Sequence, residues 1–493
     1  MKSVITILIL STLLFSQNSV YTKDVSIQTS FENVILPDGE NMGLVGLNYL
    51  LHPNKYFYYG LGTYGAATGD RGGFFTGGVT VGVKYDIFKN IYIDSGAFLG
   101  AGGGASADGQ GGGLMFKAYS GLLVDFGKYS LGANYSYIKF PNGNIDSQQI
   151  GLIADMKFTT TISDDILDLD SLSTYNFSSD EDYLIATYQT YLPVNETKTR
   201  AGTLRTENIN LIGVEYGIHL DSHFLTYIES AGAFSGANGY MEILAGAAYA
   251  QKLTTNSELL AKGSLGLGGG GQVDTGGGGI TKASLVLSYS PSKSINTRIG
   301  GGYFHSLDGG FDAPFAEVSL GINTNFLSTG SKKNEVDYSS IYSQKFNIRF
   351  VNQTYFYSQT LSTDSSRKHD VQLMGVKLDW FLNDKFYVSG QAFAAYAGKA
   401  AGYASGMFGL GFVQPIGLGF NAVGEIDLGA GAGGSVNTGG GAITQPMTGL
   451  SYNFTQDLAF SMIAGKIIAL NGDLDANVLD LSIVYKFNKL RLK

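Results

Sequence analysis

Hydrophobic and polar residues alternate along most of this 493-residue chain. In the stretch 73–88, GFFTGGVTVGVKYDIF, residues Val79, Val81 and Val83 share one face, while Thr80 and Lys84 share the other. The stretches 150–158 and 479–487 follow the same alternation. Because successive side chains of a strand point to opposite faces, this pattern predicts β-strands. No stretch shows convincing helical periodicity.

Three sequence landmarks recur at nearly constant spacing. LVGL at 44–47 returns as LIGV at 211–214 and LMGV at 373–376. Glycine-rich segments begin at 100, 266 and 429, and NGNID at 142–146 returns as DGGFD at 308–312 and NGDLD at 471–475. The chain is therefore predicted to be a triplicate of one domain-sized unit. In the first copy, alternating runs lie near 24–35, 42–51, 56–67, 73–87, 91–102, 113–126, 129–140 and 148–159.

The first residues carry an export pattern. Lys2 precedes the short apolar stretch SVITILILSTLLF at 3–15, and a polar segment follows. This predicts a signal peptide over residues 1–22, too short to span a bilayer as a helix. The chain has no cysteine, so no disulfide or thiolate chemistry is available.

The connections between the predicted strands alternate in character. Short polar turns such as HPNK at 52–55 and FKN at 88–90 alternate with longer variable loops that include the glycine-rich segments. With the signal peptide, the amphipathic strands and a last strand ending in Tyr485 and Phe487, the chain resembles the bacterial outer-membrane β-barrel class in its small eight-stranded form. The resemblance implies an antiparallel up-and-down transmembrane barrel in the outer membrane of a Gram-negative bacterium. It also implies the lipid bilayer, lipopolysaccharide and the barrel-assembly machinery as partners.

Two architectures fit about eight strands in each of three copies. Tandem small barrels are favoured because the joins between copies are long for the short-turn side of a barrel. One barrel of about 24 strands is the alternative. The predicted units are barrel repeats at 23–160, 182–327 and 346–493, with linkers at 161–181 and 328–345.

The glycine-rich segments are interpreted as hairpins between the fifth and sixth strand of each copy. Glycine permits a positive φ and a close approach of backbones. Asp108, Asp274 and Asn437 are predicted at the hairpin tips, where Asp and Asn favour turns. A phosphate-binding loop is not expected, because no Gly-Lys-Ser/Thr follows and no helix begins.

The acidic residues Asp146, Asp312 and Asp475 close the second recurring motif of each copy. They are predicted to be turn residues before the eighth strand. They are also candidate ligands for divalent cations that bridge lipopolysaccharide.

One stretch of the second copy is similar to the lipid A deacylase family, whose members are eight-stranded barrels. YFHSLDGGFDAPFAE at 303–317 holds His305, Ser306, Asp312 and Glu317. The resemblance implies a histidine base, a serine nucleophile and an orienting carboxylate. His305 and Ser306 are adjacent, however, so on a strand they point to opposite faces, and the other copies lack the histidine.

The predicted function is that of a non-catalytic outer-membrane protein with a structural, surface-interaction or permeability role. A porin-like channel formed by one large barrel and a lipid A acyl hydrolase are the alternatives, and a soluble secreted β-protein is a further one. No cofactor is predicted. Nucleic acid is not expected as a partner, because the net charge is −9. A surface ligand would be of unknown identity.

Overall fold

The computed structural model describes residues 20–163, 172, 175–179, 181–194, 197–329, 338–366 and 368–492. Almost all regular structure in these residues is antiparallel β-strand, with one short 3-10 helix at Tyr338–Ser340. Within this part of the chain, no helix is long and apolar enough to cross a membrane. The prediction of an all-β antiparallel barrel protein is confirmed.

The first ring consists of eight strands, each hydrogen-bonded to its neighbour in sequence, and β1 closes the ring by pairing with β8 from Val20↔Ser163 to Glu32↔Gly151. The strands are β1 (Val20–Ile35), β2 (Asn41–His52), β3 (Phe57–Thr68), β4 (Phe75–Phe88), β5 (Ile91–Gly103), β6 (Leu114–Asp125), β7 (Tyr129–Lys139) and β8 (Asp146–Ser163).

The second ring closes through β10 and β17, which pair from Tyr183↔Asn323 to Tyr191↔Phe315. Its strands are β10 (Asp182–Tyr191), β11 (Ile209–His219), β12 (Phe224–Ser235), β13 (Met241–Lys252), β14 (Ser257–Gly269), β15 (Gly279–Tyr289), β16 (Ile295–Ser306) and β17 (Asp312–Asn323).

The third ring closes through β19 and β26, which pair from Ile341↔Leu492 to Tyr355↔Val478. A single residue pair, Asn488↔Ser163, connects it to the first ring. Its strands are β19 (Ile341–Tyr355), β20 (Val371–Phe381), β21 (Phe386–Ala397), β22 (Ala404–Gly417), β23 (Phe420–Ala432), β24 (Ala442–Asn453), β25 (Leu458–Ala469) and β26 (Asp475–Leu492).

The two faces of each strand differ as the alternation predicts. On β4, Thr76 and Thr80 are buried inside the ring, whereas Val79, Val81 and Val83 are exposed on its outer surface. The rings are therefore polar inside and apolar outside, the reverse of a water-soluble β-sandwich.

The strands that begin and end the first and third rings are longer than predicted. β8 continues to Ser163, so the first three residues of the predicted 161–181 linker are strand, and β19 begins at Ile341, inside the predicted 328–345 linker. β1 begins at Val20, within the predicted signal peptide, whose residues 1–19 lie outside the described part. The extensions persist because their backbones stay paired and Val20, Ile341 and Leu490 are buried against the linkers.

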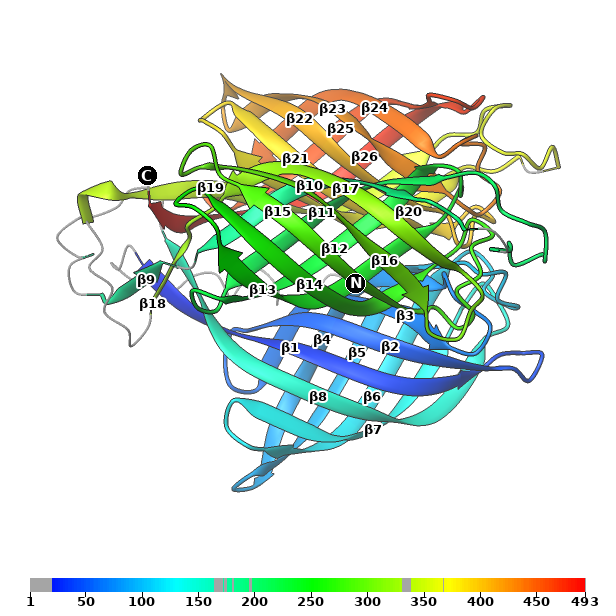
Figure 1. Ribbon diagram of the computed structural model, residues 1–493, viewed down its shortest axis with the longest axis horizontal. Coiled ribbons are helices and arrows are strands. Elements are labelled where there is room, and N and C mark those ends of the chain that lie inside the picture. Colours follow the sequence, from blue (N-terminus) through cyan, green and yellow to red (C-terminus); the bar gives the residue numbers. More distant parts are fainter. Residues whose placement is uncertain are drawn as a thin grey trace.

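The linkers build a small structure at the short-turn end of the rings. β9 (Phe177–Ser179) and β18 (Leu327–Thr329) pair with each other, beside the long strand ends in Figure 1. Phe326, Phe346 and Trp380 form an aromatic cluster between the second and third rings, with the Phe346 and Trp380 ring centroids 5.3 Å apart. This end therefore ties the three rings together.

At the opposite end the glycine-rich hairpins join the rings in a cycle. The second ring's hairpin accepts a hydrogen bond from the first ring, Gly72 N to Gly276 O at 2.9 Å. The first ring's hairpin accepts one from the third, Gly402 N to Gly102 O at 3.3 Å. The third ring's hairpin accepts one from the second, Asn238 Nδ2 to Gly439 O at 2.6 Å. Each hairpin thus contacts the loop between the third and fourth strands of another ring. Three such head-to-tail contacts connect the three rings in a closed cycle.

Glycine is required at these contacts because backbones touch. A Cβ on Gly72 would lie 2.7 Å from Gly276 O, and one on Gly277 would lie 2.4 Å from the Cα of Thr68. Figure 1 shows the three rings packed side by side with their axes roughly parallel. The close approach of small residues is also how membrane-embedded elements pack together.

Adding a methyl group at this contact should loosen it. We expect Gly72→Ala and Gly277→Ala each to lower the free energy of unfolding by about 1–3 kcal/mol, the usual cost of overpacking. Denaturant unfolding of the detergent-solubilised protein measures this. Gly263→Ala on β14 is the control, because a Cβ there meets no atom within 4 Å. Equal stability of all three variants would contradict the proposed tight backbone contact.

Candidate functional site

Buried ion pairs occupy the middle of the second ring's interior, between two hydrophobic clusters. Lys282 Nζ lies 2.7 Å from Glu229 Oε1 and 2.5 Å from Glu242 Oε1. Nearer the short-turn end, Glu215 accepts from Lys262 at 2.7 Å and from Arg298 at 2.9 Å. An isolated buried charge is costly, so these groups are stable inside the ring only as a paired network.

The first and third rings contain networks of the same kind. In the first ring, Lys117 pairs with Glu32. In the third ring, Arg349 Nε lies 2.8 Å from Asp379 Oδ2, and Lys377 Nζ lies 2.6 Å from Glu425 Oε2. Sequence reasoning did not single out these residues, although the signal was present: each is a charge on the polar face of an otherwise alternating strand.

Apolar residues close the other end of each interior. In each glycine-rich hairpin, the residue that precedes the predicted tip residue is buried at this end. Residues Ile145, Phe311 and Leu474 of the second recurring motif are buried beside it. The hairpin residues are Ala107, Val273 and Val436. The two recurring motifs therefore cover the loop end of each ring with apolar side chains.

Of the predicted tip residues, Asp274 itself connects the two motifs within its ring. Asp274 accepts from Phe311 N through its backbone oxygen at 2.9 Å and from Gly310 N through Oδ2 at 3.1 Å. Next to Asp108, Gly109 O accepts from Asn144 N at 2.7 Å. Asn437 instead donates its backbone N–H to Leu361 O at 3.1 Å, a contact with the loop between β19 and β20.

The four candidate catalytic residues do not form one site. His305 Nδ1 lies 2.7 Å from Asp312 Oδ1 on the outer surface of the second ring. Ser306 points inward and is buried, with its hydroxyl donating to Phe311 O at 2.6 Å. Glu317 is buried on the inner face, 3.9 Å from Lys262 Nζ. His305 and Ser306 face opposite sides of the strand, as their adjacency predicts, so the serine–histidine contact implied by the deacylase resemblance is absent from the pairs that these described residues make.

The three candidate metal ligands lie on different rings, each beside a basic residue of its own ring. Asp146 lies 3.3 Å from Lys139, Asp475 lies 2.9 Å from Lys466, and Asp312 pairs with His305 as above. In the residues that the structure covers, no three potential metal ligands come together.

The third ring differs from the second in the middle of its interior. Strand pairing places Gln445 where the second ring has Lys282, Gln391 where it has Glu229, and Ser405 where it has Glu242. This part of the third ring is therefore neutral. The amides of Gln391 and Gln445 have no hydrogen-bond partner among the described side chains.

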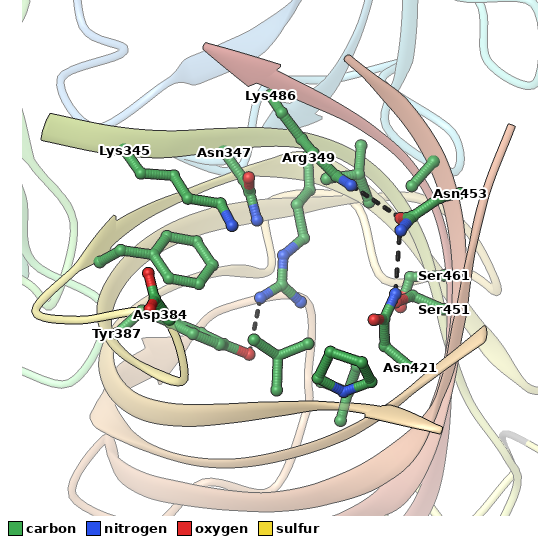
Figure 2. Close-up of a pocket in the computed structure, with 16 residues that line it drawn as sticks. Lys345, Asn347, Arg349, Asp384, Tyr387, Asn421, Ser451, Asn453, Ser461 and Lys486 are labelled. Atoms are coloured by element: carbon green, nitrogen blue, oxygen red, sulfur yellow. Dashed lines mark hydrogen bonds between the residues drawn. The ribbon is translucent and has the colours of Figure 1, made fainter. Parts of the chain in front are cut away.

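A pocket of about 220 Å³ opens at the short-turn end of the third ring. Figure 2 shows Lys345, Arg349 and Lys486 converging on it from β19 and β26. Lys486 Nζ donates to Asn453 Oδ1 at 2.7 Å, and the Lys345 ammonium lies 4.5 Å from the centre of the Phe381 ring. Other polar lining residues are Asn347, Asp384, Tyr387, Asn421, Ser451 and Ser461.

No family model and no curated protein matches this sequence. Solved structures similar to it include a mutant ferric enterobactin receptor from Pseudomonas aeruginosa bound to enterobactin, with a TM-score of 0.29 and 9% identity over 96% of this chain and 82% of that chain. Pseudomonas aeruginosa OpdQ has a TM-score of 0.21 and 9% identity, covering 95% of this chain and 98% of that chain. Acinetobacter baumannii OccAB4 has a TM-score of 0.22 and 10% identity, covering 96% of this chain and 99% of that chain. Scores this low assign neither a family nor a function.

The second ring's ion pairs can be tested with the third ring's own residues. We expect Lys282→Gln to lower the free energy of unfolding by about 3–5 kcal/mol, because Glu229 and Glu242 then remain buried without their cation. The triple variant Lys282→Gln, Glu229→Gln, Glu242→Ser should recover most of that loss. Denaturant unfolding followed by circular dichroism measures both. A triple variant no more stable than the single one would contradict the pairing explanation.

Proposed function

We propose that this chain is a non-catalytic integral protein of the bacterial outer membrane, in which three small barrels form one structural and surface-interaction unit. The observation that carries the proposal is the apolar outer surface of the rings. Ile150 and Leu152, for example, are 77% and 66% exposed on β8 while their inward neighbours are polar or buried. Such a surface is stable in hydrocarbon and unfavourable in water.

Closure of each ring supports the same placement. Every strand of a ring pairs on both sides, so its backbone hydrogen bonds do not depend on water. This is the condition that a bilayer imposes on a spanning β-structure. With the short turns in the periplasm, the joined glycine-rich hairpins would form the extracellular surface.

A porin-like channel is the second candidate function. Two features support this candidate. The third ring has a pocket at its mouth, and the chain forms closed antiparallel β-structure with polar residues inside, as porins do. Against it stand the apolar seal and the ion pairs in each interior, because an eight-stranded barrel is just wide enough to be filled by its side chains.

Membrane placement and conduction can be measured separately. The purified protein should enter the detergent-rich phase on phase separation, and in planar bilayers it should give no large, stable conductance steps. Stable steps of porin size would favour the channel candidate. Recovery in the aqueous phase without detergent would contradict membrane insertion altogether.

A further inference from the structure

The mouth of the third ring lacks large or ion-paired side chains that occupy the corresponding positions of another ring. Strand pairing places Ser461 where the second ring has Arg298, and Asn421 where it has Glu258. It places Val484 where the first ring has Asp155, which pairs there with Lys84 at 2.9 Å. These exchanges remove the arginine and the glutamate of the second ring, and the ion pair of the first ring, from the mouth of the third ring.

The charge at this mouth changes as well. Lys345 opposes Phe381 at the position where the first ring has Asp24 opposite His52 and where the second ring has Glu181 beside His219. An acidic residue of two rings is thus basic in the third.

The ammonium group of Lys486 lacks the carboxylate partner that the corresponding lysine has in the first ring. In the first ring, Lys157 Nζ lies 2.6 Å from Asp125 Oδ2. The corresponding pair in the third ring is Lys486 with Asn453, so a neutral amide accepts the hydrogen bond that a carboxylate accepts in the first ring.

Positive charge exceeds negative charge at the pocket, because Lys345, Arg349 and Lys486 line it together with a single carboxylate, that of Asp384. Arg349 is balanced by Asp379 and Glu425 below the pocket. Lys345 and Lys486 form no ion pair within 4.0 Å of a carboxylate among the described residues, although the charge of Asp457 acts on Lys486, and both lysines line the pocket drawn in Figure 2. Two ammonium groups held near one another in a part-buried pocket attract an anion more strongly than they would on an open surface.

We propose that this mouth is a binding site for a small, hydroxylated organic anion with a carboxylate or phosphate group. Lys345 and Lys486 would hold the anionic group through charge-assisted hydrogen bonds. The amides and hydroxyls of Asn347, Asn421, Ser451 and Ser461 line the remaining space and suit the hydroxyls of such a solute. That the site faces the periplasm rests on the proposed function, whereas the existence of the site does not.

The experiment is calorimetric titration of glycerol 3-phosphate, with gluconate as the carboxylate probe and glycerol as the neutral one, into the detergent-solubilised full chain at low salt. We expect saturable binding of the anions and none of glycerol. Tighter binding of one anion identifies which of the two anionic groups the site takes.

The variants that test the site introduce into the third ring residues that the other rings have at the corresponding positions. Lys345→Glu introduces the acidic residue of the second ring, and Asn453→Asp restores the carboxylate partner of the first. Each should weaken anion binding at least tenfold, whereas Lys89→Glu, the same charge change on a short turn of the first ring, should alter it less than twofold. Circular dichroism establishes that each variant is folded.

Absence of binding to the wild-type protein, or equal weakening by Lys89→Glu, would overturn the site. Neither result would change the detergent partitioning of the protein or its lack of conductance in planar bilayers. Failure of the site is therefore distinguishable from failure of the proposed membrane role.

Discussion

Closure of the backbone hydrogen-bond ladder within eight strands is the constraint on which the rest of this structure depends. A ring of eight has no free edge, so its outer surface can be apolar throughout. The same small circumference leaves an interior that side chains must fill. Both faces of every strand are thereby specified, and the sequence alternates accordingly.

Filling a polar interior creates a second requirement. Charged groups such as Glu215, Glu229 and Lys282 have to be matched inside the ring, because a lone buried charge is strongly destabilising. The three copies satisfy this condition with different residues. The second ring is densely charged, while the third has glutamines in part of its network and a pocket at its mouth, where Lys345, Arg349 and Lys486 outnumber the single lining carboxylate, Asp384. The three rings therefore share one backbone plan and differ in how their interiors are filled.

The alternation in the sequence predicted the strands and their approximate ends well, because a period of two follows directly from strand geometry. The ends of β8 and β19 were predicted less well, since their extensions depend on packing against linkers far away in the sequence. The glycine-rich segments contain glycines with positive φ, such as Gly271 and Gly434, and approach other backbones closely. Their contact with the next ring was not predictable, because Gly72 and Gly276 come together only after both rings have formed. Likewise, a charge on a polar face marks an inward residue such as Lys282, but the identity of its partner depends on the curvature of the closed ring.

Ring closure within each copy can be measured directly, because the chain has no cysteine of its own. Thr29 of β1 and Ala154 of β8 are register partners on the outer surface, so the double variant Thr29→Cys, Ala154→Cys should oxidise to an intramolecular disulfide in the folded protein. Thr29→Cys, Ile483→Cys, which places the second cysteine at the position of the last strand that corresponds to Ala154 and would pair with β1 in one wide barrel, should stay reduced. A disulfide in the second variant but not in the first would contradict three closed rings.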